Sequence, residues 1–133
     1  MKRVITFGTF DVFHVGHLNI LERARALGDY LIVGVSSDEL NAKKKKRYPI
    51  YSEPDRIHII SSLRCVDEVF VEESLELKEE YVVGYNADIL VMGDDWKGKF
   101  DFIKPLCEVR YLERTPSIST TEIIEVVKSH SQH

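Results

Sequence analysis

The chain has 133 residues, of which 44% are hydrophobic and 30% are charged, and this is enough to build one domain around a single core. Its formal net charge of −4 at pH 7 gives no overall basic surface for nucleic acid. No apolar stretch approaches membrane-spanning length, no leader precedes Val4, and the two cysteines lie far apart in apolar surroundings. We therefore expect a soluble, cytoplasmic protein with free thiols, no nucleic-acid partner and no membrane insertion.

Short apolar, β-branched runs alternate with runs of helical periodicity from one end of the chain to the other. Strands are expected at 4–7, 30–36, 68–71, 89–92 and 109–112, and helices at 17–27, 54–63, about 76–85 and 120–128, with a short helix near 100–106. Such alternation predicts an α/β fold: a single Rossmann-like domain over residues 1–133, with a five-stranded parallel sheet covered by helices on both faces. The polar residues at about 129–133 are expected to form a frayed tail.

Polar and unusual residues cluster just after the expected strands. They follow the first strand at 9–17, the second at 36–39, the fourth at 93–96 and the fifth at 114–121. In open parallel sheets, ligands bind beyond the carboxyl ends of the strands, where the strand order reverses. The pattern therefore predicts one site at this edge of the sheet.

The segment from Gly8 to His17 carries the most specific pattern. It links a strand to a helix and contains two glycines, Asp11, and the histidines His14 and His17 three residues apart. A helix N-terminus presents backbone N–H groups and a favourable dipole to an anion, and an imidazole can add a hydrogen bond to a phosphate oxygen. Zinc binding by the two histidines is the alternative, but Asp11 is the only further ligand nearby in sequence, so we expect no metal site here.

A lysine-rich run, 43–47, follows the second strand and the polar residue Asp38. The run can form a solvated charged surface, a flexible cationic lid over a triphosphate or a nucleic-acid patch, for which Tyr48 and Tyr51 are the aromatic residues that could stack on bases. We favour the lid. Arg56 and Arg64, eight residues apart, present either an exposed charged face or guanidinium groups that face a phosphate.

Two later segments complete the predicted site. Gly93, Asp94 and Asp95 follow the fourth strand, where one of the two aspartates can hold a ribose hydroxyl, a base amine or a divalent cation. Ser119 opens a Ser-Thr-Thr-Glu sequence that matches a helix capping box, and Arg114 precedes it. A second helix N-terminus would thus approach the same anion from the other side.

Several familiar catalytic motifs are absent from the sequence. It has no P-loop, no Gly-x-Ser-x-Gly elbow and no Gly-x-Gly-x-x-Gly after the first strand. The site offers groups that stabilise anions and no evident nucleophile. This favours direct displacement at phosphorus by an acceptor that is already an anion, with catalysis by positioning and charge stabilisation.

The residues 8–11 with His14-Val15-Gly16-His17, together with Ile118-Ser119-Thr120-Thr121, resemble the two signatures of the HxGH nucleotidyltransferases, in their cytidylyltransferase branch. The segments 91–96 and 114–121 resemble the bacterial glycerol-3-phosphate cytidylyltransferases. The resemblance implies transfer of CMP from CTP to sn-glycerol 3-phosphate, with CDP-glycerol and pyrophosphate as products. It also implies a divalent cation, usually Mg²⁺, and a homodimer.

The resemblance also implies roles for individual residues. His14, His17, Lys46 and Arg114 would be catalytic. The CTP site would comprise these four with Thr9, Phe10, Asp11, Gly16, Asp94, Thr115, Ile118, Ser119, Thr120 and Thr121. The acceptor site would comprise Lys44 and Lys78, supported by Asp38 and Arg64.

Two departures from the family pattern concern the acceptor side. The segment 47–56 is about one residue longer than in the family pattern, so the lysines that match the family's lysines could be shifted by one residue. Leu75 stands near a position where the family often has tryptophan. Other acceptors therefore stay open, namely phosphoethanolamine, phosphocholine, a sugar phosphate, or FMN with another nucleotide. A nucleotide-binding module without catalysis is the alternative of a different class.

Overall fold

A computed structural model describes residues 1–114 and 119–131. Five strands form one parallel sheet in the order β3-β2-β1-β4-β5. Their bounds are β1 Arg3–Gly8, β2 Tyr30–Ser36, β3 Glu68–Glu72, β4 Ile89–Gly93 and β5 Glu108–Leu112. The chain builds outward from β1 to β3 and then returns to the other side of β1 with β4. The strand order therefore reverses between β1 and β4, where open α/β sheets bind their ligands.

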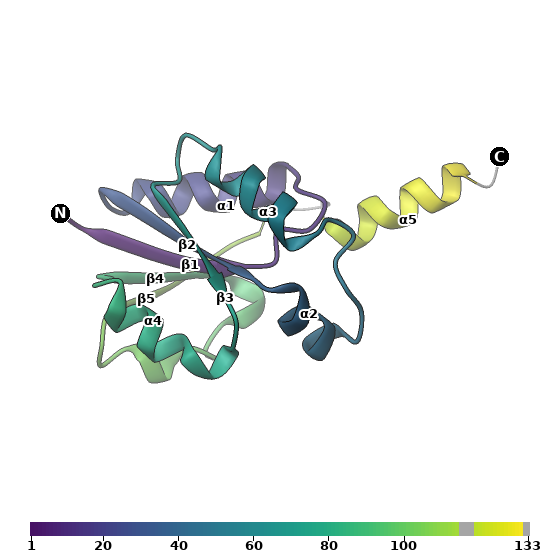
Figure 1. Ribbon diagram of the computed structural model, residues 1–133. Coiled ribbons are helices and arrows are strands. Elements are labelled where there is room, and N and C mark those ends of the chain that lie inside the picture. Colours follow the sequence, from purple (N-terminus) through teal and green to yellow (C-terminus); the bar gives the residue numbers. More distant parts are fainter. Residues whose placement is uncertain (115–118, 132–133) are drawn as a thin grey trace.

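Helices cover both faces of the sheet, as predicted (Figure 1). On one face lie α1 (Val15–Ala26) and α3 (Glu53–Ser61); on the other lie α4 (Lys78–Gly84) and the 3₁₀ helices η1 (Leu75–Leu77), η2 (Asp94–Trp96) and η3 (Asp101–Ile103). The alternating side chains of β1 show why two layers form, because Val4 packs with the α1 and α3 layer and Ile5 with the α4 layer.

Three elements differ from the expected ones by more than two residues or in kind. The short helix expected near 100–106 is the 3₁₀ helix η3 at Asp101–Ile103. The segment after β2 is a helix, α2 (Asp38–Lys45), and Lys43, Lys44 and Lys45 form its last turn, so the expected flexible loop is wrong at these residues. Helix α5 (Thr120–Ser131) extends three residues past its predicted end, and its polar residues 129–131 are helical. Residues 132–133 of the predicted tail lie outside the described part.

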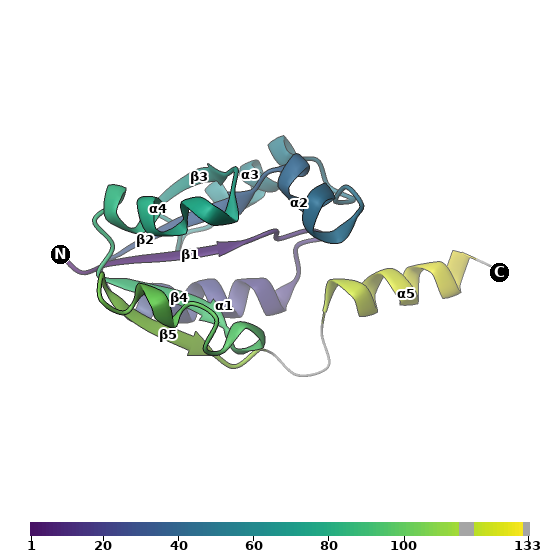
Figure 2. The same ribbon diagram turned by 90° about the horizontal axis from the view of Figure 1, so that it is seen from below.

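Helix α5 projects away from the sheet in both views (Figures 1 and 2). Its start lies near the carboxyl ends of the strands, at the same end of the molecule as α2. Both cysteines are free and half-buried. None of the helices in the described ranges has the length and apolar character to span a membrane.

Candidate active site

A cavity of about 360 Å³ opens at the carboxyl ends of the strands, at the reversal between β1 and β4. It is lined by the loop after β1, by α2 and the residues that follow it, by the ends of β3 and β4, and by the start of α5. The polar and unusual residues that follow the strands therefore meet at one place, as the position rule predicts.

The two histidines cap the start of α1. His14 is the N-cap residue, and its Nδ1 accepts a hydrogen bond from the Gly16 N–H at 3.0 Å, while His17 Nδ1 accepts one from the His14 N–H at 3.2 Å. This is a reciprocal capping box in which imidazole nitrogens replace the usual hydroxyl and carboxylate. Because both Nδ1 atoms accept, each neutral imidazole carries its proton on Nε2, where it can donate to a ligand.

The environment keeps the histidines neutral. Burial lowers the pKa of His17 to about 4, with a further contribution from His14. Burial also lowers the pKa of His14. The rings stack with centroids 3.9 Å apart, a distance at which two imidazolium ions would repel each other. His17 lines the cavity, and the His14 ring stacks against the His17 ring.

The loop between β1 and α1 is held in an uncommon conformation. Phe10 and Val12 have φ angles of 56° and 47°, in the left-handed region that bulky and β-branched residues rarely occupy. The Phe10 ring folds back over Gly8, where a Cβ would lie 2.8 Å from it. Glycine at position 8 therefore allows the ring to pack beneath the loop.

Asp11 ties this loop to two other segments. Its carboxylate accepts hydrogen bonds from the N–H groups of Ile50 and Tyr51, both at 2.8 Å, and its backbone oxygen accepts one from the Thr120 hydroxyl at 2.9 Å. The carboxylate of Asp11 is thus engaged in holding the loop in place. Ser119 caps α5 by accepting from the Glu122 N–H at 3.1 Å, which confirms the serine half of the predicted capping box.

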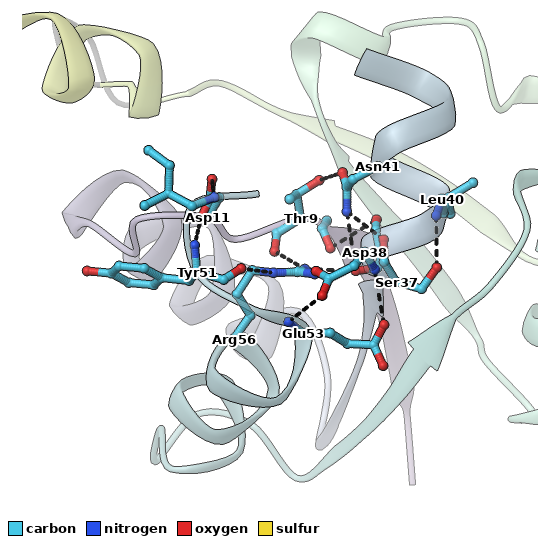
Figure 3. A network of polar contacts seen from close by, with 12 residues as sticks. Thr9, Asp11, Ser37, Asp38, Leu40, Asn41, Tyr51, Glu53 and Arg56 are labelled. Carbon is cyan, nitrogen blue, oxygen red and sulfur yellow. Dashed lines mark hydrogen bonds and ion pairs between the residues drawn. The ribbon is translucent and has the colours of Figure 1, made fainter. Parts of the chain in front are cut away.

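Arg56 is fully buried, so neither of the two interpretations of this residue was right. Its guanidinium donates to the carbonyl oxygens of Thr9, Ser36 and Tyr51 and to the Asp38 carboxylate at 2.6 Å (Figure 3). These partners come from the loop after β1, the end of β2, the start of α2 and the segment that precedes α3. Arg56 therefore holds together the segments at the carboxyl ends of the strands, although it does not itself line the cavity.

Asn41, which is also buried, completes this network. Its amide nitrogen donates to the carbonyl oxygens of Ser36 and Ser37, and its Oδ1 accepts from the Thr9 hydroxyl at 2.7 Å (Figure 3). The Thr9 proton is therefore engaged, and its oxygen meets the cavity as an acceptor.

The predicted acceptor residues divide into two groups. Lys44 and Lys78 line the cavity. Asp38 does not, and its carboxylate is held by Arg56 and by the Glu53 N–H. Arg64 is exposed and precedes β3, so it lies at the opposite end of the sheet and lines a second, more open depression. The assignment of Arg64 to the acceptor site is corrected by this placement.

The predicted nucleotide residues also differ in their placement. The side chains that line the cavity include those of Thr9, Phe10, Asp11, His17, Arg114, Thr120 and Thr121. Lys46 ends α2 in a left-handed conformation and is exposed, whereas its neighbour Lys45 lines the cavity and bears on the pKa of His17. Gly16 is buried at the start of α1, and Asp94 is half-buried in η2 beside the lining residue Asp95. Thr115 and Ile118 lie outside the described residues.

Glu72 and Asn41 were not predicted as site residues, and the sequence did not decide between Asp94 and Asp95 or fix which lysines of the run enter the site; Glu72, Asn41, Lys45 and Asp95 all line the cavity. Glu72 and Asp95 stand at or just after strand ends, so the position rule contained the signal for them. Asp95 lies 3.9 Å from the Arg114 guanidinium across the cavity rim.

The geometry is that of a nucleotide-binding α/β site, and comparisons with known proteins agree. The cytidylyltransferase-like family model matches residues 5–126. The glycerol-3-phosphate cytidylyltransferase of Bacillus subtilis is 52% identical over 127 residues, covering 96% of this chain and 98% of that protein. The enzyme of the same name from Staphylococcus aureus is 52% identical over 124 residues, with 92% of each chain covered.

Among solved structures, the lipopolysaccharide core biosynthesis protein from Thermoplasma volcanium superposes with a TM-score of 0.72 at 30% identity, covering 86% of this chain and 97% of that one. The chain belongs to the cytidylyltransferase-like family.

Proposed function

We propose that the protein transfers CMP from CTP to sn-glycerol 3-phosphate, giving CDP-glycerol and pyrophosphate. The observation that carries the proposal is the cavity in which the neutral imidazole of His17, stacked on that of His14, stands beside a cationic pocket. The full-length likeness to proteins named glycerol-3-phosphate cytidylyltransferase supplies the two substrates.

The reaction needs no covalent intermediate. An oxygen of the acceptor phosphate forms a bond to the α-phosphorus of CTP, the bond from that phosphorus to the bridging oxygen breaks, and pyrophosphate leaves with the electron pair. The acceptor is already an anion, so no base is required. His14 and His17 would donate through Nε2–H to phosphate oxygens as negative charge develops on them.

The CTP side of the site would be the loop after β1 and the start of α5. Thr9, Phe10, Gly16, Thr120 and Thr121 would surround the nucleotide, with the N-termini of α1 and α5 directed at the phosphates. Ser119, Asp94, Thr115 and Ile118 keep the roles that the family resemblance implies. Arg114 would neutralise charge on the triphosphate, together with Lys46 or its neighbour Lys45.

The acceptor side favours a purely anionic substrate. Lys44 and Lys78 line this end of the cavity with a single carboxylate, Glu72, among the described residues, so the pocket is net positive. A cationic head group, as in phosphoethanolamine or phosphocholine, would meet two ammonium groups there. Glycerol 3-phosphate brings no positive charge, and its hydroxyl groups are neutral hydrogen-bonding groups.

A divalent cation, Mg²⁺ by the family resemblance, is expected to arrive with the triphosphate. Within the described part of the chain, no three His, Cys, Asp or Glu side chains are grouped closely enough to hold a metal. This fits magnesium, which commonly binds through substrate phosphates and water with one or two carboxylates. Asp95 would be the carboxylate in reach, and the ion would neutralise phosphate charge. We also propose that the enzyme is a cytoplasmic homodimer.

The test is release of pyrophosphate from CTP with glycerol 3-phosphate, compared with phosphoethanolamine, phosphocholine and a sugar phosphate, and from ATP with FMN. Turnover should be highest with glycerol 3-phosphate. His17→Ala should lower kcat by about a hundredfold or more, since it removes a transition-state donor, whereas His58→Ala, at an exposed position on α3, should not. Turnover confined to another acceptor, or a fully active His17→Ala variant, would overturn the assignment.

A further inference from the structure

Glu72 and Lys78 form an ion pair from which solvent is almost excluded, at the acceptor end of the cavity. Glu72 ends β3 and is 1% exposed, and Lys78 begins α4 and is 2% exposed. The Lys78 ammonium donates to Oε2 of Glu72 and lies 3.8 Å from the centroid of the Phe7 ring. The Ser36 hydroxyl lies 3.3 Å from both Oε1 of Glu72 and the Gly8 carbonyl oxygen, and its one proton can be donated to either. Both oxygens of this carboxylate therefore have a donor within hydrogen-bond distance.

A buried ion pair is weak evidence for stability, because apolar side chains of similar volume often serve as well. Both members of this pair line the cavity, which points to a role in the site. Burial lowers the pKa of Lys78 and of Lys44, and at both lysines the Glu72 carboxylate opposes that fall. Lys45, Lys78 and Arg56 lower the pKa of Lys44 further by repulsion. Glu72 is thus the group that favours two charged lysines at this end of the cavity.

We propose that Glu72 is a positioning residue for the acceptor: it holds Lys78 protonated before glycerol 3-phosphate binds and yields the ammonium to the acceptor phosphate when it does. The inference rests on the proposed function. The phosphate carries more negative charge than the carboxylate and enters the same cavity, so it can replace Glu72 as the partner of Lys78. Glu72 itself touches no reacting atom.

The kinetic test compares Glu72→Gln with the natural protein between about pH 6 and pH 9. Glutamine keeps the shape but loses the charge, so Lys78 should deprotonate at lower pH. At the acid end of this range Lys78 should be protonated in both proteins, and only the variant lacks the carboxylate that repels the acceptor phosphate. The KM of the variant for glycerol 3-phosphate should therefore be no higher there than that of the natural protein. At the alkaline end it should be about tenfold higher. The KM for CTP should change less than twofold.

Glu73→Gln is the matched control, because this substitution removes the same charge at the neighbouring residue, which is exposed. It should leave both KM values unchanged at every pH. A purely structural role of Glu72 would raise the KM for glycerol 3-phosphate by one factor at all pH values, and that result would overturn the proposal. So would a profile that coincides with that of the natural protein.

A measurement without turnover separates this inference from the proposed function. Lysine labelled with ¹³C at Cε reports protonation of each ammonium by NMR, and the Lys78 signal is identified by its loss in Lys78→Met. In the natural protein Lys78 should be charged at about pH 7.5, and inorganic phosphate should shift its signal. If Glu72→Gln does not fold, this titration still decides: a neutral Lys78 in the natural protein, or a signal that phosphate leaves unmoved, would refute the role of Glu72.

Discussion

His17 should make the protein less stable in mild acid, and His17→Gln should remove most of that loss. The pKa of His17 is lowered from 6.5 to about 4 in the folded protein, chiefly by burial. As the pH falls, the unfolded chain therefore takes up a proton before the folded one does. The stability contributed by neutral His17 is fully present above about pH 6.5 and is lost between there and about pH 4.

The size of the effect follows from the two pKa values. The full difference corresponds to about 3 kcal/mol, and about 2 kcal/mol of it should be lost by pH 4.5, where folded His17 begins to protonate. Glutamine suits the test because its side-chain oxygen can accept from the His14 N–H, as glutamine does at this position of a capping box, but it does not titrate.

The assay is urea unfolding at pH 7 and at about pH 4.5, followed by circular dichroism. The free energy of unfolding of the natural protein should fall by about 2 kcal/mol more than that of His17→Gln between the two pH values. Titrating carboxylates are common to both proteins and cancel in this comparison. His58→Gln, which removes an exposed imidazole, should behave like the natural protein. Equal losses in His17→Gln and the natural protein would refute the reasoning.

Two further substitutions test how the site is held together. Gly8→Ala places a Cβ 2.8 Å from the Phe10 ring, so the KM for CTP should rise by about tenfold in steady-state kinetics. Gly84→Ala is the control and should leave this KM unchanged, because the added Cβ meets no atom outside its own helix within 4 Å. Equal KM values in both variants would exclude this role for Gly8. Arg56→Lys cannot reach all four acceptors of the guanidinium, so the free energy of unfolding should fall by about 2–3 kcal/mol in urea. Arg64→Lys at an exposed position should change it by less than about 0.5 kcal/mol, and a similar small change for Arg56→Lys would contradict its structural role.

The sheet was predictable because its strands are nearly continuous apolar runs. Residues of β2 and β4 are buried on both faces, which leaves little ambiguity about where a strand lies. The position of the site was also predictable. Alternating strands and helices predict a parallel sheet, and the carboxyl ends of all its strands meet at the edge where the site lies. Helix α1, however, begins two residues earlier than predicted, because His14 serves as its N-cap and histidine is not among the usual capping residues.

Helix α2 was missed because it has almost no apolar face. Among its residues only Leu40 and Asn41 are buried, so a lysine-rich sequence gives no helical periodicity to detect. Its start is fixed by Ser37, whose hydroxyl oxygen accepts from the Leu40 N–H at 3.0 Å. The signal present in the sequence was this cap and the acidic first turn, not hydrophobic spacing.

The burial of Arg56 could not be inferred from the sequence around it. Its acceptors include the carbonyl oxygens of Thr9 and Ser36, 47 and 20 residues away. Backbone carbonyl groups occur at every residue, so their convergence on one guanidinium depends on tertiary structure alone. A charged residue on an amphipathic helix is usually exposed, and Arg56 is buried because four segments of the chain bring their acceptors to its guanidinium.

In this site, lysine and arginine side chains supply positive charge, and neutral histidines supply hydrogen-bond donors. Five cationic side chains and three anionic ones line the cavity within the described residues, although the whole chain carries a net charge of −4. A polyphosphate is therefore attracted to the cavity and repelled by much of the remaining surface. The histidines contribute N–H donors without adding charge, because backbone groups occupy their Nδ1 atoms and burial holds them neutral. The donor function of His17 should accordingly persist unchanged from neutral to alkaline pH, and alkaline loss of activity should come from the lysines at the acceptor end.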